Sequence, residues 1–488
     1  MRKNNIYAFN THYEIYDYSI GDNPKLERAL TYRDRAAHTD YPKYLYDKEE
    51  RTLYIPRGYN SMFLEEWNGK PVTIVDNDSN DIRTDYMMVK PPRDENEEKA
   101  IRFLVGEGEF SGLRLSSQKV LIMAPGMGKT YCTIAAIQKL HTKSLIIMRT
   151  QSLKEQWFAR YEEYTNLGGP NMVDIDSSEF LHSLLKKKPS RNQKVFIVTR
   201  RLLISYCEKY GVDSLQEVLN HIGIGVKVFD EAHQEYAMTL LIDYFTNVKR
   251  TFYLTATFHL SSYGNRDTVF QTAFYKVPKL QLRQSDDARH IIYIAVLFNS
   301  HPNAVDIARV TGGKRKYNKY AYVDYELSKG ILEKEVRSLI SFFLNEKEMS
   351  GKTLILSSKK ATCDFFKEIA DDETDRRFNV CSFYTGNKVD NYKSYDIITA
   401  TSGMLGTGED IPGLRFMHNT EPGSSLPNTD QFSGRLRPFE GGNKPTFYIE
   451  YVDVGFDRLY DWYRSRSKLL KTKVKECKEL NHIGGYGI

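Results

Sequence analysis

The chain of 488 residues is long enough for about three domains of ~100–200 residues each. Hydrophobic residues make up 41% and charged residues 27%, and the net charge of +6 permits a polyanionic partner without requiring one. The sequence has no apolar run of membrane-spanning length, no signal-peptide core and no CxxC spacing among its five cysteines. We therefore expect no membrane partner, no disulfide framework and no structural zinc, in a cytoplasmic protein (of the host cytoplasm if viral).

Residues 1–85 are rich in tyrosine, asparagine and aspartate, as is typical of short strands and turns. Residues 53–58 (LYIPRG) indicate one strand that ends in a turn at Pro56 and Gly58. A polar loop follows at residues 76–81. The sequence therefore predicts a small N-terminal domain over residues 1–85, of α+β or mostly-β type.

From Val120 onward, apolar runs rich in β-forming residues alternate with helical stretches. Strands buried on both faces of a parallel sheet have such sequences. The predicted strands are residues 120–123, 144–148, 195–198, 226–229 and 251–254, and then residues 290–297, 353–356, 380–383, 396–398 and 447–452. We therefore predict an α/β fold with two successive parallel-sheet domains, residues 86–285 and 286–456, and a basic helical tail over residues 457–488.

A glycine-rich loop joins the first of these strands to a helix expected at residues 130–140. Backbone N–H groups of such a loop can hold phosphates, while Lys129 would neutralise them and Thr130 would ligate Mg²⁺. Met123 stands where the strict Gly-x4-Gly-Lys-Thr pattern has its first glycine. The predicted cofactors are ATP and Mg²⁺, and the predicted nucleotide-binding residues of the loop are Gly126, Met127, Gly128, Lys129 and Thr130.

An acidic pair, Asp230 and Glu231, directly follows the predicted strand at residues 226–229. Alone, such a pair is more often a solvated strand end, but the phosphate loop upstream favours a catalytic interpretation. Ligands bind at the carboxyl ends of strands in α/β sheets. Asp230 would then hold Mg²⁺ through water, and Glu231 would orient or deprotonate the attacking water.

Six short segments occur in a fixed order along the chain. They are residues 123–130 (MAPGMGKT), 153–157 (LKEQW), 230–233 (DEAH), 255–257 (TAT), 406–412 (GTGEDIP) and 431–437 (QFSGRLR). Together they resemble the superfamily-two helicases and translocases of the Asp-Glu-Ala-His type, from about Arg93 to Arg437. The resemblance implies two tandem RecA-like domains with ATP bound to the first.

The resemblance also implies roles for residues outside the phosphate loop. His233 would couple the nucleotide to the nucleic-acid side, and further residues of the nucleic-acid side are Thr150, Gln156, Thr255, Thr257 and Thr401. Second-domain residues toward the nucleotide are Gly408, Asp410 and Gln431. Arg435 and Arg437 would reach the transferring phosphate, because the arginine fork stabilises developing charge on phosphate oxygens.

Two departures from the family pattern affect this assignment. The family places its second arginine three residues after the first, where this chain has Pro438, so Arg435 keeps the family spacing and Arg437 is shifted. The family also has a glutamine that reads adenine where this chain has Asn96. Asn96 has a shorter reach, which leaves the preference for ATP over other triphosphates open.

Three functional hypotheses follow. The leading one is an ATP-dependent DNA helicase or translocase that unwinds or remodels duplex or branched DNA in replication, recombination or repair. It is most similar to phage recombination and branch-migration helicases and related repair and poxvirus transcript-release helicases, in which an added domain like residues 1–85 recognises duplex DNA. The alternatives are an RNA helicase or transcript-release translocase, and a non-hydrolysing nucleic-acid-binding scaffold. We expect a monomer, or a transient oligomer on nucleic acid.

Two basic segments allow either of two interpretations. Residues 312–320 (GGKRKYNKY) interleave cations with tyrosines, as a nucleic-acid contact or a solvated loop would. Residues 458–478 carry many lysines and arginines, as a phosphate-binding helix or a solvated helix face would.

Overall fold

The structure is a computed structural model with two compact units, Met1–Arg283 and Gln284–Ile488. It describes residues 4–34, 39–75, 82–124, 126–233, 235–256, 266–282, 289–311, 317–345, 350–374, 376–387, 389, 391–402, 411–420, 423, 429, 432–439 and 444–482. None of the helices in these ranges is both long and apolar enough to cross a membrane.

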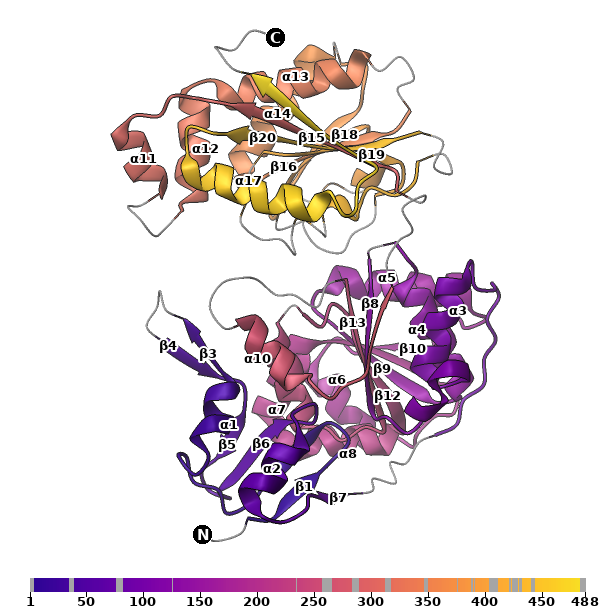
Figure 1. Cartoon of the computed structure of the whole chain (residues 1–488). Coiled ribbons are helices and arrows are strands. Elements are labelled where there is room, and N and C mark those ends of the chain that lie inside the picture. Colours follow the sequence, from indigo (N-terminus) through magenta and orange to yellow (C-terminus); the bar gives the residue numbers. More distant parts are fainter. Residues whose placement is uncertain are drawn as a thin grey trace. The chain divides into compact units, whose positions relative to one another are not determined.

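A seven-stranded, wholly parallel sheet forms the centre of the first unit (Figure 1). Its order is β10-β11-β9-β12-β13-β8-β14. The strands are β8 (Gln118–Met123), β9 (Lys143–Met148), β10 (Met172–Asp174), β11 (Val195–Thr199), β12 (Ile224–Phe229), β13 (Arg250–Thr255) and β14 (Lys279–Leu282). The sheet confirms the predicted fold class, with β10 and β14 added to the expected strands.

Helices cover both faces of this sheet. Successive strand residues point to opposite sides, and apolar residues on both sides are buried against these helices. Leu121 and Met123 pack with α3 (Glu95–Val105), α4 (Lys129–Leu140) and α5 (Gln151–Tyr164), whereas Val120 and Ile122 belong to the core on the other face. The helices of that second face include α6 (Ser178–Ser183), α7 (Arg200–Tyr210), α8 (Val212–Ile222), α9 (Tyr236–Tyr244) and α10 (Arg266–Ala273) (Figure 1).

The N-terminal region forms a mixed sheet of order β5-β6-β2-β1-β7 and a separate β3-β4 hairpin. The strands are β1 (Ile6–Ala8), β2 (His12–Ile15), β3 (Thr31–Asp34), β4 (Thr39–Pro42), β5 (Leu45–Asp47), β6 (Thr52–Pro56) and β7 (Thr73–Ile74), and the helices are α1 (Pro24–Ala29) and α2 (Ser61–Asn68). The α+β character matches the prediction for this part of the chain.

This N-terminal sheet shares one hydrophobic core with the first parallel-sheet domain. Buried residues such as Tyr13 and Leu53 lie in the same cluster as Tyr236 and Tyr253. Polar contacts reinforce the junction, since Ser117 Oγ donates to Asn10 O over 2.7 Å. The N-terminal region is therefore part of the first compact unit.

Gly58, in the predicted strand-to-turn segment, packs directly on the end of α10 and the residues that follow it. Lys276 N donates to Gly58 O over 2.8 Å, and a Cβ at Gly58 would lie 2.4 Å from Ala273 O and 2.9 Å from Phe274 Cα. These contacts are with backbone atoms, which cannot rotate away. The junction between the two sheets therefore requires a residue without a side chain here.

We expect Gly58→Ala to destabilise the protein by about 1–3 kcal/mol, the usual cost of overpacking. The matched control is Gly112→Ala, because a Cβ at Gly112 meets nothing within 4 Å. Thermal unfolding of both variants checks this prediction: the melting temperature of Gly58→Ala should fall, while that of Gly112→Ala stays near the wild-type value. Equal melting temperatures would show that the junction tolerates a methyl group.

The second unit repeats the architecture with a parallel sheet of order β17-β18-β16-β19-β20-β15-β21. Its strands are β15 (Ile291–Phe298), β16 (Lys352–Ser357), β17 (Val380–Phe383), β18 (Ile397–Thr401), β19 (Leu414–Asn419), β20 (Thr446–Asp453) and β21 (Glu476–His482). Its helices include α11 (Ala304–Thr311), α12 (Lys319–Ser328), α13 (Ile331–Asn345), α14 (Lys360–Glu373) and α17 (Asp457–Leu470).

The prediction of a helical tail over residues 457–488 is wrong for residues 476–482. After α17 the chain forms β21, which pairs in parallel with β15 at the edge of the sheet. Arg466 of α17 is 1% exposed, and its Nε donates to Glu450 Oε2 over 3.1 Å. This buried ion pair anchors α17 to β20, so Arg466 supports the fold and is not part of a basic surface.

Candidate functional site

The predicted phosphate loop and acidic pair lie at one edge of the first sheet. Strands β8, β12 and β13 end at Met123, Phe229 and Thr255. In their parallel register, Phe229 lies opposite Tyr253 and Thr255 lies opposite Ile122. The segments that follow these strands therefore meet at the carboxyl edge, which is where α/β sheets bind ligands.

The phosphate loop turns sharply into α4. Gly126 and Gly128 have φ angles of 84° and 92°, which side chains strongly disfavour. A Cβ at Gly128 would also lie 2.1 Å from Glu97 Oε1. Helix α4 begins at Lys129, so its first N–H groups and its dipole are available to an anion.

Lys129 points back over the loop toward the acidic pair. Its Nζ donates to Met123 O over 2.9 Å and lies 3.8 Å from Glu231 Oε1. The ammonium group is therefore held where loop and acidic pair converge. The neighbouring Thr130, second residue of α4, is partly buried. The Arg93 guanidinium also lies at the loop, where its Nη2 donates to Gly126 O over 3.4 Å.

The carboxylate of Asp230 is held by two donors. Trp157 Nε1 donates to Oδ2 over 2.8 Å, and Glu231 N donates to Oδ1 over 3.0 Å. Glu231 itself has a φ angle of 47°, an uncommon conformation for a residue other than glycine. Such backbone strain is typical of functional sites.

Arg200 supports the same segment and was not predicted from the sequence. Its side chain is fully buried, and its Nη2 donates to Asp230 O and, over 3.3 Å, to Glu231 O. Arg200 directly follows β11, whose end lies at the same edge of the sheet. The sequence does show a cationic residue immediately after an apolar strand. It does not show that this residue contacts Asp230 and Glu231, which lie about 30 residues further along the chain.

His233 links the acidic pair to β13. Its Nδ1 lies 2.8 Å from Thr255 Oγ1 and 3.3 Å from Glu231 Oε2. Both His233 and Thr255 are buried, at 4% and 1% exposure. The structure thus brings together three residues that the sequence assigned to nucleotide chemistry and to its coupling.

Burial raises the pKa of Asp230, and the negative charge of Glu231 raises it further, while the Trp157 hydrogen bond opposes both effects. A nearby cation would stabilise the ionised form. Mg²⁺ is commonly held by one or two carboxylates together with substrate phosphates and water. Asp230 and the hydroxyl of Thr130 provide this kind of oxygen donor.

The remaining acid also fits a hydrolytic site. Glu231 Oε2 is buried and accepts no hydrogen bond from the described residues, since His233 Nδ1 makes its hydrogen bond with Thr255. Within those ranges, no three His, Cys, Asp or Glu side chains gather as a metal centre of their own. Any Mg²⁺ here would depend on phosphate and water for its other ligands.

Glu97, rather than Asn96, lies against the phosphate loop. Its two oxygens accept hydrogen bonds of 2.7 Å from Arg93 N and Arg93 Nε, and Oε1 is the atom closest to a Cβ at Gly128. Asn96 is partly buried in the first turn of α3. The predicted base-reading role of Asn96 stays a prediction.

The other predicted residues are more scattered. Thr150 is the N-cap residue of α5, Gln156 has a buried amide nitrogen within that helix, and Thr401 ends β18 in the second unit. Arg435 is 5% exposed and Arg437 is partly exposed. Predicted residues outside the described ranges are Thr257, Gly408, Asp410, Gln431 and the loop residues 312–316.

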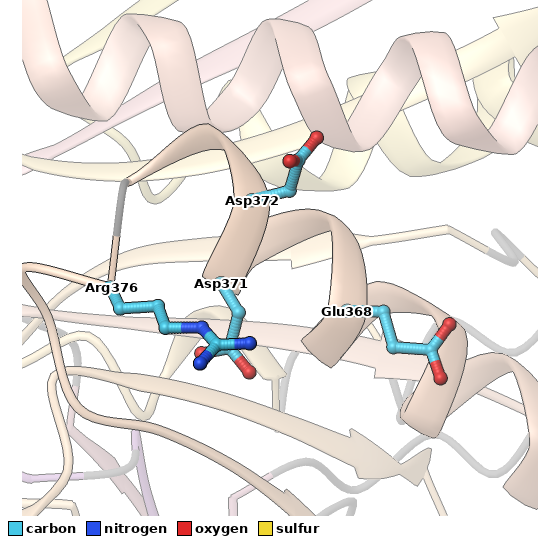
Figure 2. A pocket seen from close by; sticks show the side chains of 4 residues that line it. All are labelled: Glu368, Asp371, Asp372 and Arg376. Carbon is cyan, nitrogen blue, oxygen red and sulfur yellow. The ribbon is translucent and has the colours of Figure 1, made fainter.

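A depression of about 470 Å³ on the second unit has a different character. It is lined by Glu368, Asp371, Asp372 and Arg376 (Figure 2). Three of its four side chains are acidic, and Figure 2 shows Arg376 beside Asp371. These residues lie at the end of α14 that leads into β17, hence at the amino edge of the sheet, and their charge disfavours a phosphate ligand.

Comparison with known proteins adds a partial sequence match and a match of fold. Residues 95–260 match the family model described as "Type III restriction enzyme, res subunit". A comparison with curated protein sequences gave no match. The matched segment spans the phosphate loop, the acidic pair and the Thr255 segment.

Two solved structures show the same fold. Mss116p (NTE and C-tail double deletion) bound to ssRNA and AMP-PNP has 16% sequence identity and a TM-score of 0.52, with 80% of this chain and 78% of that chain covered. S. cerevisiae Dbp5 bound to RNA and ADP BeF3 has 15% identity and a TM-score of 0.50, covering 79% and 89%. The chain has the fold of these structures, with two tandem RecA-like domains.

Proposed function

We propose that this protein is a nucleic-acid-stimulated ATPase that acts as a DNA helicase or translocase on duplex or branched DNA, in replication, recombination or repair. The observation that carries the proposal is the cluster at the carboxyl edge of the first sheet. There Lys129 Nζ lies 3.8 Å from Glu231 Oε1, beside an Asp230 carboxylate held by two donors. This is the constellation needed to hold a triphosphate next to an acid that can activate water.

In this mechanism the phosphate loop binds ATP through its N–H groups and the start of α4. Bound Mg²⁺, held by Asp230 and Thr130, would supply charge neutralisation on the phosphates. Lys129 would stabilise the charge that develops on the transferred phosphoryl group. Glu231 would accept the proton of the attacking water or orient that water in line with the bond that breaks.

We assign roles in ATP turnover to residues of the second domain. Arg435 and Arg437 would stabilise the transferred phosphoryl group, and Gly408, Asp410 and Gln431 would contact the nucleotide. Thr150, Gln156, Thr401 and Thr257 would contact nucleic acid. His233 and Thr255 would relay the nucleotide state, a role supported by their 2.8 Å contact and by the approach of His233 to Glu231.

DNA is the proposed substrate because the Asp-Glu-Ala-His box and the Gln156-Trp157 pair are most similar to those of recombination, repair and restriction translocases. The match of residues 95–260 to a restriction-enzyme family model supports this choice. RNA is the second candidate, since both similar structures are bound to RNA. A non-hydrolysing scaffold is less well supported, because the described catalytic residues are all present.

Lys129→Ala tests the phosphate-loop assignment. Turnover of ATP should fall to near background, whereas nucleic-acid binding should stay within a few-fold of wild type, because other surfaces provide it. The matched control is Lys139→Ala on the same helix, because the Lys139 side chain is 49% exposed and forms a surface ion pair with Glu107. Near-normal hydrolysis by Lys129→Ala, measured at saturating ATP, would show that the nucleotide binds elsewhere.

A further inference from the structure

Trp157 has an unexpected polar contact. It lies on α5 and is 2% exposed, within the core between α5 and the sheet. Its ring packs near Tyr161, with centroids 6.2 Å apart, so packing explains the position of the ring. Packing does not explain why the indole N–H points at Asp230 Oδ2 over 2.8 Å, across 73 residues of sequence.

The hydrogen bond restricts the orientation of the Asp230 carboxylate. The terminal torsion of an aspartate is soft, and the group can otherwise turn through a broad range. Trp157 Nε1 occupies one acceptor site of Oδ2 and Glu231 N occupies one of Oδ1. Each oxygen keeps about one further acceptor site, so the remaining lone pairs are fixed in direction.

We propose that Trp157 is a positioning residue that sets the orientation of the Asp230 carboxylate toward Mg²⁺. The proposal rests on the function proposed above, in which Asp230 holds the metal. Partners that orient a metal-binding carboxylate typically change metal affinity by 10–100-fold when they are removed. Helix α5 also contains Gln156 and has Thr150 as its N-cap residue, and both of these residues are assigned to nucleic acid.

The test compares Trp157→Phe with wild type. Phenylalanine keeps an aromatic ring in the core but has no N–H donor. The chain has three tryptophans, so Trp67→Phe and Trp462→Phe are matched controls. The first readout is the rise in melting temperature as Mg²⁺ is titrated in the presence of ADP, and the second is the Mg²⁺ dependence of ATP turnover.

In both readouts, we expect the Mg²⁺ concentration that gives half of the maximal effect to rise about tenfold or more in Trp157→Phe. At excess Mg²⁺, the thermal shift and the turnover of this variant should return close to the wild-type values. The two control variants should match wild type. An unchanged Mg²⁺ dependence in Trp157→Phe would overturn the proposal, even if the variant is less stable or less active.

A second measurement covers the case in which Trp157→Phe does not fold. In the double variant Trp67→Phe, Trp462→Phe, the emission of Trp157 should change as Mg²⁺ is added with ADP, with the same midpoint as the thermal shift. No change in emission would overturn the proposal. If the wild-type protein shows no Mg²⁺-dependent thermal shift with ADP, both this proposal and the assignment of the nucleotide site are wrong. If wild type shows the shift and Trp157→Phe has the same Mg²⁺ dependence, only the proposal for Trp157 is wrong.

Discussion

Glu231→Gln is expected to bind Mg-ATP with nearly the wild-type affinity and to hydrolyse it about 10²–10⁴-fold more slowly, the usual contribution of general acid–base catalysis. The amide keeps the size of the side chain but cannot accept a proton from water. Asp230, Thr130 and Lys129 remain to hold the nucleotide and its metal. Single-turnover hydrolysis and a separate nucleotide-binding titration measure the two effects.

The control for this variant is Glu163→Gln on the surface of α5. Glu163 forms exposed ion pairs with Lys90 and Arg160, at 2.7 Å and 2.5 Å, and should not affect turnover. If Glu231→Gln lost nucleotide binding instead of hydrolysis, Glu231 would be a ligand or a structural residue. Glutamine is the substitution of choice at Glu231 because it changes the charge of the side chain while keeping its shape. A residue with different backbone preferences would also disturb the φ angle of 47° at this position.

Arg435→Ala is expected to be nearly inactive as an ATPase, and Arg437→Ala to be milder. Loss of an arginine that stabilises the phosphoryl transition state can lower turnover ~10³–10⁵-fold. Only Arg435 has the family spacing from Gln431, whereas Arg437 stands immediately before Pro438. DNA-stimulated turnover at saturating ATP compares the two variants directly.

The burial of Arg435 requires a second measurement. Arg435 is 5% exposed, and both of its terminal nitrogens are buried, so its removal also changes packing in the second domain. Melting temperatures must therefore accompany the rates. A folded Arg435→Ala that keeps its turnover while Arg437→Ala loses it would show that Arg437 is the residue that reaches the phosphate.

Local sequence patterns predicted most of the two sheets. Strands such as β8 and β12 are mostly apolar and lead into a glycine loop and into Asp230. The sequence therefore predicted both that these segments are strands and where their carboxyl ends lie. Strand β19 was missed because Arg415 and His418 interrupt its apolar run. Strand β21 was missed because its polar sequence becomes a strand only through pairing with β15.

The contacts around the acidic pair could not be predicted in the same way. Trp157 and Arg200 reach Asp230 from 73 and 30 residues away, and nothing in their local sequence specifies that approach. The position of Glu97 beside the phosphate loop depends on the rotation of α3, which a linear motif does not fix. The close contact of Gly58 with Ala273 likewise arises from tertiary packing alone.

The central claim is that nucleic acid controls ATP hydrolysis at the Lys129–Glu231 site. The most direct measurement is the steady-state ATPase rate of the wild-type protein with Mg²⁺, alone and with single-stranded DNA, forked DNA, a four-way junction or RNA. We predict a low basal rate that rises strongly with DNA, most of all with a branched substrate, and that is abolished in Lys129→Ala. Hydrolysis that is absent under every condition, or that is unaffected by any nucleic acid, would contradict the account.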